Sequence, residues 1–415
     1  MHLLRHDRHL RQIVAFAALS LTLLPGIAAA QTFRDALAAA HQADAAYISK
    51  MADLKNRRLQ ASQAGTALLP GINVSYSKAD VTGSTASSRA IDLTQPLFSM
   101  DKYLQYTLRH PLATQADAEL RLAENGLSLR VFNAMADIVR ARESLRAIKV
   151  QIDGLEVQYR RAQRMRELGQ GTVTEVSDFE VRLAVAEGNR LNLNATLDAA
   201  RRNFTLVTSL MPDVASLNVS APVTADHTDE AALFGIVRSL DPAVVAARQN
   251  LEIARIESRR AWAKYLPTVS AVAGYGSTNG AKSTGSSRVG IVFNAPLSTT
   301  TYFEQQSAAI ALDRAQESLR AAEDAAVLDA ANLLTSLRSL EAEIRVRQRA
   351  VQAAQQAVEG NLKSYQGGVK TNIDVVTSFQ TLADSEVALV NAQLNSAQAT
   401  LKLSFIENLT AEPAP

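Results

Sequence analysis

The sequence contains two copies of one pattern, about 200 residues apart. An apolar-periodic stretch at 44–70 has a counterpart at 241–267, and both begin with Asp and end with Pro. Further along, a glycine-containing turn at 169–176 has a counterpart at 368–375. Because an internal duplication decides the architecture, each copy is predicted to contain a helix, two strands, a very long helix, a turn and a last helix.

The N-terminal end has the layout of a secretory signal. Arginines precede an apolar run at 13–24, which is too short for a comfortable transmembrane helix, and small residues follow at 28–30. Residues 1–30 are therefore predicted to be removed on export. An uncleaved membrane anchor is the alternative, and the polar sequence after Ala30 argues against it.

The exported chain is predicted to consist of two repeats. The first repeat covers 31–211 and the second covers 230–410. A linker at 212–229, which contains Pro, Ser, Thr and Asp, joins them. A short tail at 411–415 follows the second repeat.

Charge and cysteine content exclude several classes of protein. The formal net charge is +2, and the signal supplies this excess, so the exported chain is neutral and lacks the basic excess of a nucleic-acid-binding protein. The absence of cysteine excludes disulfides, thiol catalysis and an acylated cysteine anchor. After the signal, no apolar run is long enough for a transmembrane helix, so insertion into a membrane would have to use strands.

Four short segments alternate between apolar and polar residues, which is the period of a strand with two unlike faces. Each is about 9–11 residues long, the length of a tilted membrane-spanning strand. Aromatic residues gather where these strands meet helices, as at the interfacial girdles of transmembrane barrels. An ordinary half-buried hairpin is the alternative. The residues predicted to face lipid are Ile72, Val74, Tyr76, Ile91, Leu93, Val269, Ile291 and Phe293.

Four strands cannot close into a barrel by themselves. An unpaired backbone group in lipid costs several kcal/mol, so a sheet there has no free edge. We therefore expect several copies of the chain to contribute four strands each to one shared barrel.

Two segments, 100–168 and 300–365, are helix-forming over lengths of roughly 100 Å at 1.5 Å per residue. Apolar residues at three-four spacing in the second segment indicate a coiled-coil seam. The first segment contains Pro111, which should kink it, and Gly154, which should weaken it. The predicted fold class is thus mainly α, with long antiparallel coiled coils and a small transmembrane β portion.

The sequence shows no catalytic, cofactor-binding or metal-binding constellation. His41, His110 and His227 are far apart and lie in unlike contexts. The segment at 274–280 has the wrong spacing for a dinucleotide fingerprint. The chain is therefore not expected to be an enzyme or to bind a cofactor.

The layout resembles the TolC-like outer-membrane efflux protein family over essentially the whole exported chain. The residues that carry the resemblance are Leu69–Pro70, Leu266–Pro267, the element 92–98, and the turns at 169–176 and 368–375. The resemblance implies that three chains form a twelve-strand barrel in the outer membrane, continuous with a helical tunnel in the periplasm. It also implies that the closed tunnel tip docks on a periplasmic membrane-fusion adaptor and on an inner-membrane pump.

Carried over by position, the resemblance places a periplasmic gate and constriction at the two turns. Tyr365 and Lys370 would belong to the closing network, with Glu175 and Thr174 as partners across the neighbouring coil. Asp374 would form an acidic ring, which is single because Thr377 stands where some members have a second acid. The full set is Thr174, Glu175, Asp178, Tyr365, Lys370 and Asp374. Acids also favour helix N-termini in general, which is the alternative reading of Glu175, Asp178 and Asp374.

The leading hypothesis is a passive exit duct for type I secretion or efflux, in the outer membrane of a Gram-negative bacterium, with most of its mass in the periplasm. Its inner-membrane partner would be an ABC transporter or a proton-driven pump. A duct dedicated to a proton-driven drug or metal pump is an alternative within this class. From other classes, a periplasmic membrane-fusion adaptor and a soluble coiled-coil scaffold remain open.

Overall fold

The computed structural model describes residues 32–81, 84–215, 217, 230–279, 284–296 and 299–409. The predicted signal at 1–30, most of the predicted linker at 212–229 and the tail at 411–415 lie outside the described residues. The predicted division of the chain into repeats therefore stays a prediction at these boundaries.

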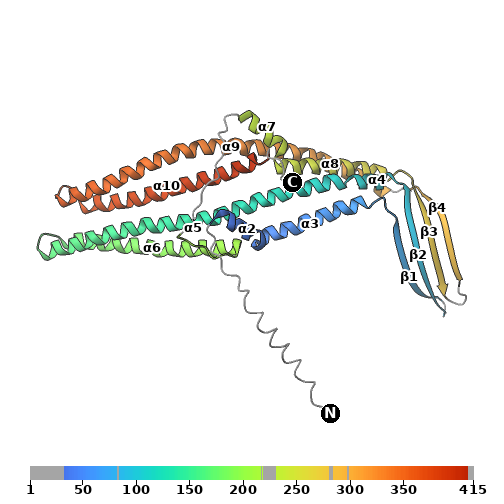
Figure 1. Cartoon of the computed structure of the whole chain (residues 1–415), viewed down its shortest axis with the longest axis horizontal. Coiled ribbons are helices and arrows are strands. Elements are labelled where there is room, and N and C mark those ends of the chain that lie inside the picture. The colour runs from blue at the N-terminus through green and yellow to red at the C-terminus, as the bar shows by residue number, and fades with distance from the viewer. Residues whose placement is uncertain are drawn as a thin grey trace, which may run out of the picture. The chain divides into compact units, whose positions relative to one another are not determined.

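The described elements follow the order predicted for a duplicated chain (Figure 1). The first copy consists of α2 (Phe33–Ala43), α3 (Ala45–Gly65), β1 (Gly71–Val81), β2 (Ser84–Phe98), α4 (Met100–Thr107), α5 (Arg109–Glu167) and α6 (Val173–Thr208). The second consists of α7 (Glu230–Leu240), α8 (Pro242–Ala263), β3 (Thr268–Asn279), β4 (Thr284–Asn294), α9 (Thr299–Gln366) and α10 (Asn372–Glu407). The short helices α2 and α7, which open the copies, were not predicted.

The predicted kink at Pro111 is confirmed as a break in the helix. Helix α4 ends at Thr107, Leu108 follows it, and α5 starts at Arg109. Pro111 therefore lies in the first turn of α5, where its missing N–H costs nothing because no intrahelical acceptor is available there. The corresponding helix of the second copy, α9, has no such proline and runs for 68 residues.

The chain divides into two compact units. One unit takes its described residues from 1–45, 127–222 and 338–401, and we call it the hairpin unit. The other takes them from 46–126, 223–337 and 402–415, and we call it the sheet unit.

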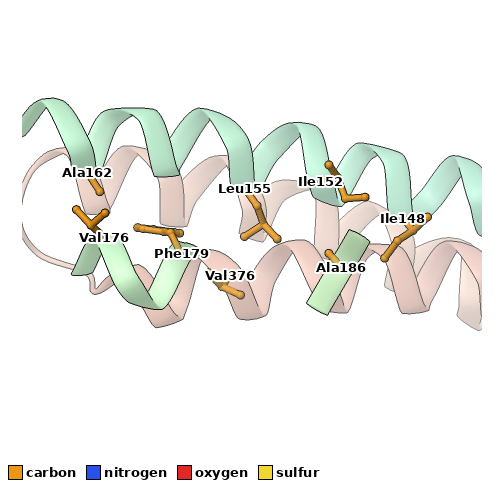
Figure 2. Packing of buried hydrophobic residues seen from close by; sticks show 8 residues of the cluster. All are labelled: Ile148, Ile152, Leu155, Ala162, Val176, Phe179, Ala186 and Val376. Carbon is orange, nitrogen blue, oxygen red and sulfur yellow. The ribbon is translucent and has the colours of Figure 1, made fainter. Parts of the chain in front are cut away.

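In the hairpin unit, apolar side chains fill the space between α5, α6 and α10. Figure 2 shows these side chains directed toward one another from the three helices. Leu155 and Phe179 are completely buried at the centre of the group. The cluster consists of Ile148, Ile152, Leu155 and Ala162 of α5, Val176, Phe179 and Ala186 of α6, and Val376 of α10.

Gly154 has a packing role that its sequence context does not reveal. A Cβ at this position would lie 2.5 Å from the ring of Phe379, which belongs to α10. The glycine therefore lets the phenyl ring approach the backbone of α5. Its low helix propensity is offset by this contact.

In the sheet unit, the four strands form one antiparallel sheet in the order β1-β2-β3-β4 (Figure 1). Ile72 lies opposite Leu93, and Leu93 lies opposite Ala273. Between β3 and β4, Ala271 lies opposite Ile291. Because residues that lie opposite each other share a face, the apolar members of all four strands form one continuous surface.

Candidate functional site

The predicted lipid-facing residues lie on this continuous apolar face of the sheet. Ile72 and Ile291 are each 72% exposed, which is unusual for isoleucine in a chain folded in water. Val74, Tyr76, Ile91, Leu93 and Phe293 are also exposed, and Val269 is partly buried. The sheet therefore presents an unpartnered apolar surface, as a membrane-spanning sheet does.

The opposite face of the sheet is polar and carries an ion pair that crosses β3. Asp92 of β2 and Arg288 of β4 lie on either side of Gly274 in the register. The guanidinium of Arg288 donates to the Asp92 carboxylate at 2.8 Å. A side chain at Gly274 would overlap that carboxylate, so the glycine keeps the path of the ion pair open.

The two predicted turns have the same local structure in the hairpin unit. Gly169 follows α5 with φ +70°, and Gly368 follows α9 with φ +74°. This left-handed backbone suits glycine and ends both helices. A threonine then begins the next helix in each case, Thr172 before α6 and Thr371 before α10. The duplication is thus visible at the level of single backbone angles.

The structure brings together Tyr365 at the end of α9 and Glu175 at the start of α6. The Tyr365 hydroxyl donates a short hydrogen bond to the Glu175 carboxylate. Burial raises the pKa of Tyr365 above its ordinary value, and the hydrogen bond to Glu175 and the negative charge of Glu175 raise it further. The phenol is therefore a neutral donor throughout the physiological range of pH.

Arg161 of α5 is a third member of this contact. Its guanidinium carbon lies 5.3 Å from the centre of the Tyr365 ring, within the range of a cation–π interaction. Sequence reasoning missed Arg161 because it stands among Arg160, Arg164 and Arg166. No local signal in the sequence distinguishes it from these neighbours.

Lys370 and Asp374 pair with each other at the start of α10. The Lys370 Nζ lies 3.5 Å from the Asp374 carboxylate, and the lysine side chain is half exposed. The Asp374 carboxylate also accepts hydrogen bonds from the backbone N–H and the hydroxyl of Thr371, at 2.9 and 2.8 Å. These hydrogen bonds, and the charge of Lys370, hold the pKa of Asp374 below its ordinary value. In this chain Asp374 completes a capping box.

The remaining predicted gate residues lie nearby without a described polar partner. Thr174 is exposed on the first turn of α6. Asp178 lines a groove of about 880 Å³ formed by α5, α6 and α10. Gln158 of α5, which was not predicted, is buried, and its side-chain oxygen has no hydrogen-bond partner among the described residues.

Within the described ranges, no helix has an apolar stretch long enough to cross a membrane. No group of three or more potential ligands lies close enough to hold a metal ion in the same part of the chain.

Comparison with known proteins agrees with this geometry. Residues 233–408 match the family model described as outer membrane efflux protein. Outer membrane protein TolC of Salmonella enteritidis is 24% identical over 356 residues, covering 80% of this chain and 72% of that protein. The chain resembles TolC-like outer-membrane efflux proteins. The protein is located in the outer membrane, and its large helical portion lies in the periplasm.

Further proteins are similar to the chain at comparable levels. The alkaline protease secretion protein AprF of Pseudomonas aeruginosa is 23% identical over 377 residues, covering 83% of this chain and 78% of that protein. Among solved structures, the outer membrane protein VceC of Vibrio cholerae superposes with a TM-score of 0.75 at 21% identity. That superposition covers 91% of this chain and 95% of VceC, and it shows a shared fold.

Proposed function

We propose that this TolC-like protein is a passive exit duct of a tripartite secretion or efflux system. The observation that carries the proposal is the described sheet, which has one exposed apolar face and one polar face, and whose four strands do not close on themselves. Such a sheet fits a wall between lipid and an aqueous passage. Transport through it needs no catalysis by the chain, and we propose that it is not an enzyme.

We propose further that the working form is a homotrimer. In the described sheet, β1 and β4 are the outermost strands, and each has one edge without a partner. Lipid does not tolerate an open edge, because each unpaired backbone group there costs several kcal/mol. Pairing β4 of one copy with β1 of the next removes both edges, and three copies close a ring of twelve strands.

The proposed partners are a periplasmic membrane-fusion adaptor and an inner-membrane pump, either an ABC transporter or a proton-driven pump. The likeness to a protein named for protease secretion supports protein cargo and an ABC transporter. Small-molecule cargo with a proton-driven drug or metal pump is the second candidate. The gene for the cognate pump would decide between them.

For the gate, we propose that Tyr365, Glu175 and Arg161 form a latch between the two helical hairpins. The latch joins the end of α9 to the start of α6 and to α5. Lys370 and Asp374 stabilise the start of α10 beside it. A few weak contacts suit a gate of this kind, because a docking partner then needs only a few kcal/mol of differential binding to open it.

Mass measurement and membrane fractionation test the duct itself. The protein purified in detergent should have the mass of three chains, and cells should hold it in the outer membrane. Reconstituted into planar bilayers, it should carry ion current without an added energy source. A monodisperse monomer that crosses bilayers, or a protein recovered from the inner membrane, would contradict the proposal.

A further inference from the structure

A basic and aromatic surface lies at the hairpin end of the apolar face. Tyr76 of β1 lies opposite Arg89 of β2 in the register, and Lys78 is the next residue of β1 on the same face. On β3, Tyr275 lies opposite Ile91, so it stands diagonally beside Arg89. Neighbours of this kind are within reach of each other's long side chains. We call Tyr76, Lys78, Arg89 and Tyr275 the outer basic patch.

All four side chains of the outer basic patch are exposed, and the two tyrosines are 63% and 61% exposed. The Arg89 guanidinium carbon lies 5.8 Å from the centre of the Tyr76 ring, so its described partner is a neutral aromatic ring. Among strand residues whose side chains the structure describes, the acidic one is Asp92, which lies on the other face and is paired with Arg288. Within the described part of the strands, the two cations on the apolar face therefore have no carboxylate partner.

The position of the patch along the strands fixes its depth. Strand β2 rises by about 30 Å from Arg89 to Phe98, at roughly 3.3 Å per residue. With a tilt of about 40°, this distance corresponds to about 23 Å along the membrane normal, close to the apolar band of about 25 Å in outer-membrane barrels. Phe98 lies at the helical, periplasmic end of the sheet. Arg89 then lies at the headgroup level of the opposite, outer leaflet.

Two of the cations at the helical edge of the apolar band have carboxylate partners. At the helical edge, Lys264 is paired with Glu304 at 2.8 Å, and Arg260 is paired with Asp101 at 3.0 Å. At the hairpin edge, Lys78 and Arg89 have no such carboxylate among the described side chains. The two cations of the hairpin edge are thus available to a lipid headgroup.

We propose that the outer basic patch binds the phosphate groups of the phosphorylated glycolipid that forms the outer leaflet of the outer membrane. A guanidinium and an ammonium supply charge-assisted hydrogen bonds to phosphate oxygens. The two phenol groups supply further donors at the same level. The acyl chains of the lipid would lie along Val74, Ile91 and Val289 of the apolar face. The proposal rests on the proposed membrane-spanning function of the sheet.

The test uses the intact protein in neutral detergent, with diphosphoryl lipid A as the probe and native mass spectrometry as the readout. The variant Lys78→Gln with Arg89→Gln should keep the mass and bilayer conductance of the parent. Since each basic residue near an anionic lipid surface contributes about fivefold to binding, the double variant should bind the lipid about 25-fold more weakly. The matched control, Lys50→Gln with Lys102→Gln, removes two exposed charges outside the strands and should bind like the parent.

Two further arms separate the possible ligands. The same glycolipid without its phosphates should bind the parent and the double variant equally weakly. Inorganic phosphate at millimolar concentration should not displace lipid A, because the acyl chains supply most of the contact. Equal lipid A binding by the parent and the double variant would overturn the proposed lipid site at the outer basic patch. Displacement of lipid A by free phosphate would overturn it as well. Loss of conductance in the parent would instead overturn the proposed duct.

Discussion

Two glycines on the polar face of the sheet differ in what a side chain would meet. A methyl group at Gly274 would overlap the Asp92 carboxylate that bonds Arg288, whereas one at Gly290 would meet nothing within 4 Å. Gly274→Ala should therefore destabilise the proposed trimer by about 1–3 kcal/mol, the usual effect of overfilling a packed site. Gly290→Ala should change stability by less than about 0.5 kcal/mol. The dissociation temperature of the trimer on gels measures both, and equal temperatures would contradict the role assigned to the ion pair.

A second glycine pair tests the hairpin unit. Gly154→Ala would place a methyl group against the Phe379 ring, so it should cost about 1–3 kcal/mol in spite of its better helix propensity. Gly188 of α6 has open space around its Cα, so Gly188→Ala should stabilise the protein by about 0.5–1 kcal/mol. Thermal unfolding followed by circular dichroism gives both values. The prediction fails if the two alanines shift the transition in the same direction.

At the scale of elements, the contact between α9 and α6 should respond to alkaline pH. The raised pKa of Tyr365 means that the folded protein holds the phenol proton more tightly than the unfolded chain does. The contribution to stability is therefore complete below about pH 10, the ordinary pKa of tyrosine, and is lost as the pH rises further. Bilayer conductance should stay flat between about pH 6 and 9 and increase above about pH 10. Tyr365→Phe should remove that increase, and a parent that stays flat to high pH would contradict the assignment.

The long elements could be predicted from sequence because each carries many copies of one periodic signal. The alternation of apolar and polar residues identified the strands and the apolar face that they share, and Pro111 identified the break before α5. The short helices α2 and α7 were not predicted because each has 11 residues, too few for a periodic pattern to stand out. Gly154 was expected to weaken its helix because the Phe379 ring that packs against it lies more than two hundred residues away in the sequence.

The turns were only partly predictable. The sequence placed Tyr365 and Glu175 at matching ends of the two copies, and the structure joins them directly. It could not show that Lys370 and Asp374 are bonded to each other and to Thr371, because helix capping and gate pairing use the same residue types. The contact of Arg161 with the Tyr365 ring depends on how α5 lies against the end of α9, which no local pattern encodes.

At the scale of the whole molecule, the trimer should depend on the outer strands. The edges of β1 and β4 are open in the single chain, so a proline at the middle of β4 should block pairing with the next copy. Ile291→Pro should therefore yield monomers that fail to insert into the outer membrane. Ile291→Val keeps the strand and its apolar face and should assemble like the parent. Gel mobility without heating separates these outcomes, and trimers of the proline variant would argue against closure through strand pairing.

We propose that this chain forms an outer-membrane duct whose tip is held shut by contacts between its hairpins. Single-channel conductance in planar bilayers tests it most directly, with the parent compared with Tyr365→Phe combined with Lys370→Glu. The first change removes the hydroxyl that bonds Glu175, and the second replaces the cation beside Asp374 with an anion. We expect a small conductance for the parent and a severalfold larger one for the double variant, with both proteins trimeric. Equal conductance of the two trimers would show that the tip is held by other contacts.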